Sequence, residues 1–167
     1  MTGKPRSTDF IHQPRKDRMY EQHVQDPYQA RGKPKEPVTC PQCGVIFHHG
    51  RWQWGEAATN ARPHTCPACQ RIKDHVPAGM LKISGEFFAS HREEVWHLIR
   101  NLESREKAER PLERIIDISD ESDALVIHFT GSHLTRATGE ALQHAYQGEL
   151  EYRHTDKDDL FRVNWSR

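Results

Sequence analysis

Long hydrophobic runs are missing from this sequence. No apolar stretch approaches the roughly 20 residues that a membrane-spanning helix needs, and the first ten residues, MTGKPRSTDF, lack the apolar segment of a secretory signal. We therefore expect a cytoplasmic protein with no membrane partner. In that compartment thiols stay reduced, and closely spaced cysteines more often bind metal than form disulfides.

Aliphatic residues are nearly absent from residues 1–38, which contain five prolines and many charges. Such a segment cannot bury enough apolar surface to offset the entropy lost on ordering. It is therefore either a solvated tail or an extended arm that orders on a partner. The second interpretation is motivated by tyrosines (Tyr20 and Tyr28) that interleave with basic residues. The basic residues that we predict to contact a polyanion here are Arg15, Lys16, Arg18, Lys33 and Lys35.

Catalytic motifs are also missing. No glycine-rich phosphate loop is followed by Lys and Ser/Thr, and no cysteine beyond the four discussed below is left as a nucleophile. Ser132 and His133, and the acidic run over residues 156–159, are explained more simply as a helix cap and a turn. We predict that the protein is not an enzyme and has no small-molecule substrate.

Net charge is zero over the 167 residues but is divided unevenly. Residues 1–38 carry a net charge of +3, residues 39–75 carry +2, and residues 76–167 carry -5. A basic front half joined to an acidic back half predicts that only the front half approaches a polyanion.

The four cysteines form two Cys-x-x-Cys knuckles, Cys40/Cys43 and Cys66/Cys69, with 22 residues between them. Four thiolates complete the tetrahedral shell that Zn²⁺ prefers, and a closed Cys₄ shell leaves no position for a substrate, so the predicted zinc site is structural. Two redox dithiols or an iron–sulfur centre are the alternatives, and the two-plus-two spacing favours zinc. We therefore predict a zinc ribbon over residues 39–75. Three nearby histidines are expected at the polar surface or against a partner: His48, His49 and His64.

The segment between the knuckles combines aromatic and basic residues. Such side chains at the tip of a ribbon can stack on bases and pair with phosphates. Alternatively, Phe47, Trp52 and Trp54 fill the small core of the module, and a mixture would pack one tryptophan inward while Arg51 faces out. The residues that we predict to bind RNA in this module are Arg51, Trp52, Trp54, Arg62, Arg71 and Lys73.

Residues 76–167 alternate between strand and helix patterns. Strands are predicted over residues 80–83, 112–118 and 125–130, with a polar turn over 119–123, and further strands carry Leu150 with Tyr152 and Phe161 with Val163 and Trp165. A turn over residues 156–159 joins these last two.

Two helices are predicted among these strands. The first carries Phe88, Val95, Leu98, Ile99 and Leu102 and ends by Pro111; the second starts at Ser132, carries Leu134, Thr138, Ala141 and Ala145 on one face, and stops by Gly148. The order of the elements is that of a split βαβ, ferredoxin-like sandwich with an extra C-terminal strand. The predicted class is therefore α+β, with an extended N-terminal arm, a Cys₄ zinc ribbon and this sandwich.

Two stretches resemble a known family. The first is the double knuckle with residues 66–74 (CPACQRIKD), 77–79 (PAG) and 85–87 (GEF), and the second is residues 130–142 (TGSHLTRATGEAL) with 148–150 (GEL). Over residues 38–167 the chain resembles a family of small bacterial proteins related to the N-terminal part of the archaeal and eukaryotic NMD-type large-subunit export adaptor. This chain has only two knuckles, so its likeness is confined to the N-terminal part of the adaptor.

The resemblance implies a zinc-ribbon protein that binds the ribosome, through rRNA of the large subunit near the tRNA sites and through ribosomal proteins. A bacterial role would differ from nuclear export, and the natural candidate is to stabilise or inactivate idle ribosomes, as in hibernation under stress. The alternative is a zinc-ribbon protein-interaction module or transcriptional regulator, because zinc ribbons support all these uses. Glutamates crowd the first predicted helix, which weighs against duplex DNA.

Overall fold

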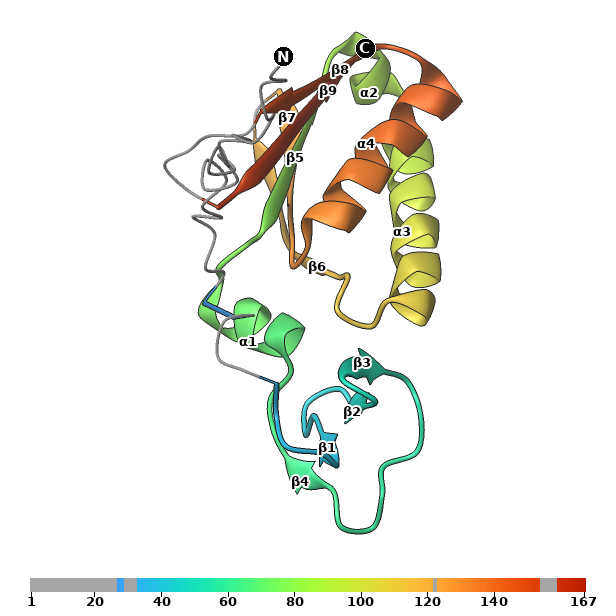
Figure 1. Ribbon diagram of the computed structural model, residues 1–167. Coiled ribbons are helices and arrows are strands. Elements are labelled where there is room, and N and C mark those ends of the chain that lie inside the picture. The colour runs from blue at the N-terminus through green and yellow to red at the C-terminus, as the bar shows by residue number, and fades with distance from the viewer. Residues whose placement is uncertain (1–26, 29–32, 122, 154–158) are drawn as a thin grey trace, which may run out of the picture.

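The computed structural model describes residues 27–28, 33–121, 123–153 and 159–167. Within these residues the chain is a mixed α+β structure with two sheets and four helices (Figure 1). The smaller sheet lies at one end of the larger one, close to the end of the longest helix. The general α+β class predicted from the sequence is confirmed.

The smaller sheet has four very short strands in the order β3-β2-β1-β4. Their bounds are β1 (Val38–Thr39), β2 (Ile46–His48), β3 (Arg51–Gln53) and β4 (Arg62–Pro63). Strand β1 runs antiparallel to β2 and parallel to β4, and β2 runs antiparallel to β3. Between β2 and β3, His49 and Gly50 both have positive φ values, 50° and 75°. The Glu36 carboxylate accepts hydrogen bonds from both of their backbone N–H groups, so a residue before β1 holds this turn.

The larger sheet has five strands in the order β6-β7-β5-β9-β8. Their bounds are β5 (Gly79–Ser84), β6 (Ile115–Glu121), β7 (Ala124–Phe129), β8 (Glu149–Arg153) and β9 (Phe161–Ser166). Every neighbouring pair is antiparallel except β5 and β9, which are parallel. Strand β8 precedes β9 in sequence but lies at the edge, so the strand carrying Trp165 is inserted between β5 and β8.

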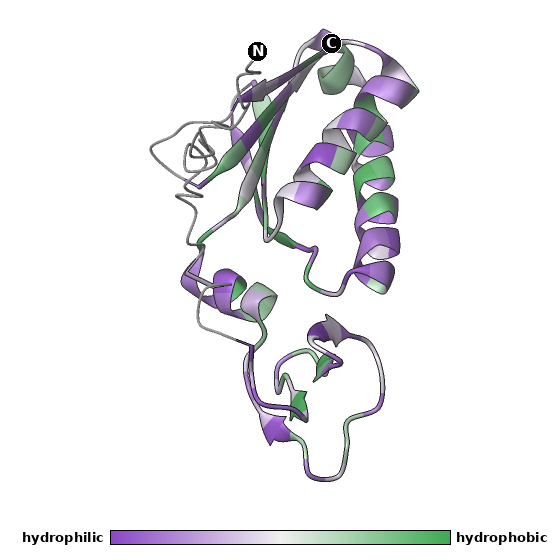
Figure 2. Ribbon diagram, viewed as in Figure 1, coloured by the Kyte–Doolittle hydropathy of each residue, from purple (hydrophilic) through white to green (hydrophobic). Residues whose placement is uncertain are grey.

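Four helices accompany the sheets: α1 (Pro67–Asp74), α2 (Glu86–Ser90), α3 (Arg92–Glu109) and α4 (Ser132–Tyr146). Helices α3 and α4 cover one face of the larger sheet (Figure 1). We call the region of the smaller sheet the smaller part of the chain, and the larger sheet with α2, α3 and α4 the larger part. Helix α1 lies at the junction of these two parts. Figure 2 shows both apolar and polar segments along α3 and α4, as expected for helices with one buried side. None of the helices in the described ranges has both the length and the apolar composition that a membrane span requires.

The main core lies between the larger sheet and these two helices. Burial alternates along β5, where Leu81 and Ile83 are fully buried and their neighbours are half-buried. Each such side chain contributes roughly 1.5–3 kcal/mol of hydrophobic free energy when it is fully buried. The other buried members of this core are Phe88, Val95, Ile99, Leu102, Leu125, Ile127, Phe129, Leu134, Leu142, Val163 and Trp165.

Small residues let α4 approach the sheet closely. A Cβ atom on Gly139 would lie 2.8 Å from Val163 Cγ1, and one on Gly79 would lie 1.8 Å from Thr135 Oγ1. The Thr135 and Thr138 hydroxyls are buried, and they donate hydrogen bonds to the carbonyls four residues earlier in α4. These polar side chains can therefore lie in the interface because backbone carbonyls accept the hydrogen bonds of their hydroxyl groups.

Most of the predicted elements are present, and four predictions about them are wrong. The expected first helix is two helices, because the chain breaks at His91 between α2 and α3, and α1 was not predicted at all. The expected turn over residues 119–123 is shorter, since β6 continues through Glu121, and β6 starts at Ile115 rather than at residue 112. Ala145 is exposed, and Leu142 takes its place on the buried face of α4. The turn expected over residues 156–159 lies almost wholly outside the described residues.

Candidate metal centre

The first cysteine knuckle is the turn between β1 and β2. Cys40 follows β1 directly, its N–H donates to the Val45 carbonyl at 2.8 Å, and its own carbonyl accepts from Gly44 N–H at 2.8 Å. Gly44 has a φ of 77°, a conformation that favours glycine. The turn brings the Cys43 side chain back toward that of Cys40.

The second knuckle begins α1. Cys66 is the N-cap residue of this helix, and its sulfur accepts a hydrogen bond from Cys69 N–H at 3.4 Å. Pro67 occupies the first helical turn, where its missing N–H leaves no donor unsatisfied. The two knuckles are joined by a hydrogen bond from Cys66 N–H to Cys40 Sγ, also 3.4 Å.

The four cysteine sulfurs converge. All lie within 4.8 Å of one another, and Cys43 Sγ lies 3.8 Å from Cys66 Sγ. A tetrahedron with Zn–S bonds of about 2.3 Å has edges of about 3.8 Å, so the spacing suits a tetrahedral thiolate site. Cys40 and Cys66 are buried, whereas the other two are half-buried. The four cysteines therefore lie close enough together to hold a metal ion.

A cation from the other part of the chain completes this site. Arg114, which lies just before β6 and is only 6% exposed, donates hydrogen bonds to Cys43 Sγ at 3.2 Å and to Cys69 Sγ at 3.3 Å. One bonded sulfur belongs to each knuckle. Sequence analysis missed this residue, because nothing in the pattern around residue 114 marks a side chain aimed at a distant cysteine.

The thiol pKa values show that the cluster needs positive charge. Burial raises the pKa of Cys43, but bonds from Arg114 and from backbone N–H groups outweigh it and lower this pKa to about 7. Burial raises the pKa of both Cys66 and Cys69, and the neighbouring thiolates add to this rise. Four thiolates in so small a volume repel one another, so a bound cation in addition to Arg114 would favour their joint ionisation.

The aromatic residues between the knuckles form the mixture considered from the sequence. Phe47 is buried, and Trp52 packs beside the cysteine cluster, edge-on to Phe47 and parallel to the His64 ring. Trp54 is 40% exposed, and its Nε1–H donates to the Lys107 carbonyl at the end of α3, at 2.7 Å. Arg51 is exposed. The three histidines expected at the surface, His48, His49 and His64, are all exposed.

Four of the predicted RNA-binding cations lie on the two edge strands of the smaller sheet or on the segment that leads into it, Arg51 on β3 and Arg62 on the opposite edge strand β4. Arg62 donates through Nη2 to the Lys35 carbonyl at 2.8 Å, and a Cβ on Gly50 would lie 3.4 Å from Lys33 Nζ. Arg51 follows Gly50 directly. We call these four exposed residues, Lys33, Lys35, Arg51 and Arg62, the ribbon cation group.

Two other predicted RNA-binding residues lie on α1, one of them buried and the other exposed. Arg71 is buried, donates to the Val76 carbonyl at 3.0 Å and packs over the Tyr28 ring at 4.4 Å, so its guanidinium serves packing. Lys73 is exposed. The predicted contacts of the arm lie outside the described residues: Arg15, Lys16 and Arg18.

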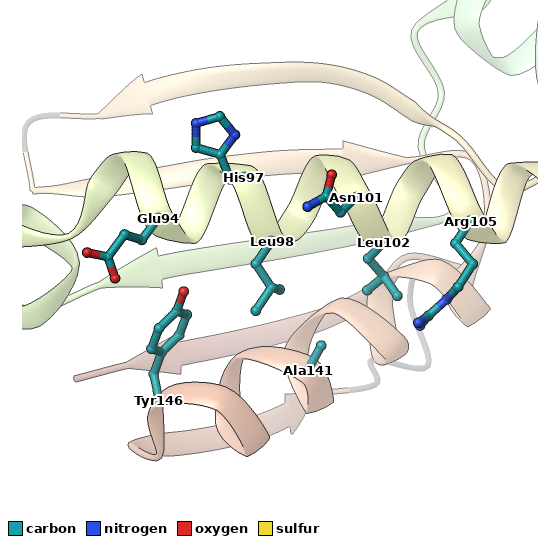
Figure 3. A pocket seen from close by; sticks show the side chains of 8 residues that line it. All are labelled: Glu94, His97, Leu98, Asn101, Leu102, Arg105, Ala141 and Tyr146. Atoms are coloured by element: carbon teal, nitrogen blue, oxygen red, sulfur yellow. The ribbon is translucent and has the colours of Figure 1, made fainter.

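A separate groove of about 600 Å³ lies between α3 and α4. Figure 3 shows Leu98, Leu102 and Tyr146 between the two helices, with Glu94 at one end and Arg105 at the other. The groove is thus mainly apolar at its centre, and the cysteine cluster does not contribute to its lining.

Comparisons of the chain with models of protein families, with curated proteins and with solved structures found no match. The functional proposals therefore depend on the residues and geometry of this chain and on the resemblance of its two sequence stretches.

Proposed function

We propose that the four cysteines bind one Zn²⁺ and that residues 39–75 are a zinc ribbon. The donor set supports zinc, because four thiolates with tetrahedral spacing and no oxygen ligand suit this metal. Bound zinc would cross-link the two knuckles and thereby stabilise a module whose own hydrophobic core is very small. Purified protein should contain one zinc per chain, and Cys66→Ser should lose it and unfold the ribbon, as elemental analysis and NMR would show.

We also propose that the larger part is a split βαβ sandwich that has gained one strand. Strands β6, β7 and β5 with helices α3 and α4 follow the order of that fold. The fourth position, beside β5, is taken by β9 instead of β8, which makes this one pair parallel.

We propose that the chain is a non-enzymatic, cytoplasmic RNA-binding protein that docks its ribbon on rRNA of the large ribosomal subunit near the tRNA sites. Its role would be to stabilise or inactivate idle ribosomes. The ribosomal part of this proposal derives from the family resemblance of the two sequence stretches, and the proposed RNA contact derives from the exposed basic side chains of the ribbon.

The ribbon cation group is the observation that carries the proposal. Four exposed cations lie on a module of about forty residues, while the acidic residues are concentrated in the larger part of the chain. Glu36 follows Lys35 directly in the sequence, and its carboxylate accepts hydrogen bonds from two backbone N–H groups. Hydrogen bonds from Gly50 and His49 keep the pKa of Glu36 below its usual value, although the slight burial of the group opposes this. A phosphate backbone would thus meet a net positive surface.

Co-sedimentation with purified ribosomes across a salt series tests the proposal. Binding should weaken steeply with salt, since each cation that reaches a phosphate releases counterions. The double variant Arg51→Gln/Arg62→Gln should bind more weakly and lower the slope of log affinity against log salt by about two units. The matched control, Arg105→Gln/Lys107→Gln on α3, should behave as the unmodified chain does. If the unmodified protein does not pellet with ribosomes even at low salt, the ribosomal role is wrong and the protein-interaction alternative takes its place.

A further inference from the structure

Arg114 is held rigidly by the larger part of the chain. Its backbone N–H donates to Thr130 Oγ1 at 2.9 Å, and its carbonyl accepts from Thr130 N–H at 2.9 Å. Its Nε–H donates to the Pro111 carbonyl at 2.8 Å. The backbone and the base of the guanidinium are therefore fixed before the side chain meets any cysteine.

The two terminal nitrogens of this guanidinium reach the metal site. Nη1 donates to Cys69 Sγ and Nη2 donates to Cys43 Sγ, so one planar group spans the two knuckles. A planar guanidinium that makes two such bonds fixes the orientation of the two knuckles relative to Arg114 and also supplies a positive charge. A lysine ammonium supplies the charge without fixing the orientation.

Charge favours this contact when the metal is bound. Four thiolates and one divalent cation carry a net charge of -2, and Arg114 supplies +1 at the surface of the cluster. A guanidinium this well buried needs a charged partner to offset its desolvation, and the metal-bound thiolates are the partner that the geometry provides.

Other contacts cross the same boundary. Trp54 Nε1–H donates to the Lys107 carbonyl, and the Arg114 guanidinium lies 5.9 Å from the centre of the Trp54 ring. Leu112 packs against the cysteine cluster from the larger part. These contacts surround the bonds from Arg114 to the sulfurs and complete a small interface.

We propose that the metal centre is also the joint between the two parts of the molecule. Arg114 binds the metal-loaded pair of thiolates and thereby holds the ribbon against the end of α3 in one orientation. Loss of this guanidinium releases the ribbon from the larger part while both parts stay folded. The inference rests on the proposed metal site and not on RNA binding.

Two readouts on purified, zinc-loaded full-length chain test this joint. Arg114→Gln should weaken zinc affinity by about 10- to 100-fold in competition with a chromogenic chelator, as loss of partners that orient ligands typically does. The Trp54 indole N–H, assigned in ¹⁵N NMR spectra through Trp54→Phe, should also exchange with solvent faster by about tenfold or more once its bond to Lys107 opens. Arg114→Lys, which keeps the charge without the planar guanidinium, should give an intermediate result.

The matched control is Arg110→Gln, because Arg110 lies four residues away, is exposed and pairs with Glu106. It should leave both readouts unchanged. The joint is disproved if Arg114→Gln keeps the indole exchange rate of the unmodified chain, whatever its zinc affinity. Should the Arg114 variants not fold, nuclear Overhauser contacts in the unmodified zinc-loaded chain decide. Contacts from the Arg114 side chain to the β-protons of Cys43 and Cys69 support the joint, and their absence overturns it.

A chain that takes up no zinc would refute the metal proposal and the joint together, whereas a zinc-loaded chain with unaffected Trp54 refutes the joint alone.

Discussion

Glu113 acts as a helix cap from outside its helix. Its Oε2 accepts a hydrogen bond from Leu134 N–H, in the first turn of α4, at 2.8 Å. A Cβ on Gly131, just before α4, would lie 2.3 Å from Glu113 Oε1, so a glycine is needed where the carboxylate enters. Burial raises the pKa of Glu113 above its usual value even though the bond from Leu134 lowers it.

Replacing Glu113 with Gln should change how stability depends on pH. Because the folded chain holds the Glu113 proton more tightly than the unfolded chain, the favourable contribution of this group is fully present below the ordinary pKa of 4.5 and is lost as pH rises through the raised pKa. The free energy of unfolding of Glu113→Gln should therefore increase relative to that of the unmodified chain as pH rises above 4.5. Urea unfolding of both chains from pH 4.5 to 7.5 measures this difference.

Glu109→Gln is the matched control for this titration, since Glu109 is an exposed carboxylate at the end of α3. The same urea series is measured for this variant, and the pH-dependent difference of Glu113→Gln is compared with it. A Glu113→Gln difference that is flat, or that changes in the opposite direction, would show that the capping bond outweighs the burial of the charge.

Among the elements, α4 and β5 are packed at a distance that only glycine allows. Gly79→Ala would place a methyl group against Thr135, which is fully buried and already bonded to the Gly131 carbonyl. We expect a loss of roughly 1–3 kcal/mol of unfolding free energy, the usual cost of overpacking a filled core. Thermal and urea unfolding measure the loss. Gly55→Ala is the control, because its added methyl meets only the flexible end of Ile46 at the surface, and it should change stability little.

The elements that sequence could predict are those whose signal is local. The start of α4 at Ser132, the alternation in β5 and the apolar positions of β9 all follow from spacing along the chain. The convergence of the four cysteines was also predictable, since two identical knuckles form a single four-ligand set more readily than two separate sites.

What could not be predicted depends on contacts between distant segments. Strand β9 pairs with β5 although the two strands are about eighty residues apart in the sequence. No local sequence pattern predicts this pairing. Arg114 belongs to the metal centre through bonds to cysteines 45 and 71 residues away. Helix α1 was missed because its eight residues have little apolar character apart from the cysteines.

On the scale of the whole molecule, two clusters of buried residues stay separate. The larger one draws all of its members from residues 81–165, and the smaller one is built on the cysteines with Val45 and Ala68. The larger part therefore contains a core of its own, of the size that a domain of about 90 residues requires for independent folding.

Residues 76–167 expressed alone should consequently fold. We expect a single cooperative thermal transition and dispersed NMR spectra, with a lower melting temperature than in the full chain because Arg114 and Leu112 lose their partners in the ribbon. Arg114→Leu within this fragment should be tolerated better than in the full chain, since no thiolates remain to pair with the guanidinium. A fragment that is disordered by NMR would mean that the smaller cluster is an integral part of the core.

The position of β9 has a consequence for the order of events during synthesis. A growing chain emerges from its N-terminal end, so β5, both covering helices, β6, β7 and β8 are made before residue 161. Until β9 arrives, one side of β5 has no hydrogen-bonding neighbour, and the edge strand β8 has no partner at all. The native strand order of the larger sheet is therefore complete only when β9, the latest of its described strands along the sequence, inserts between β5 and β8 and brings Val163 and Trp165 into the core.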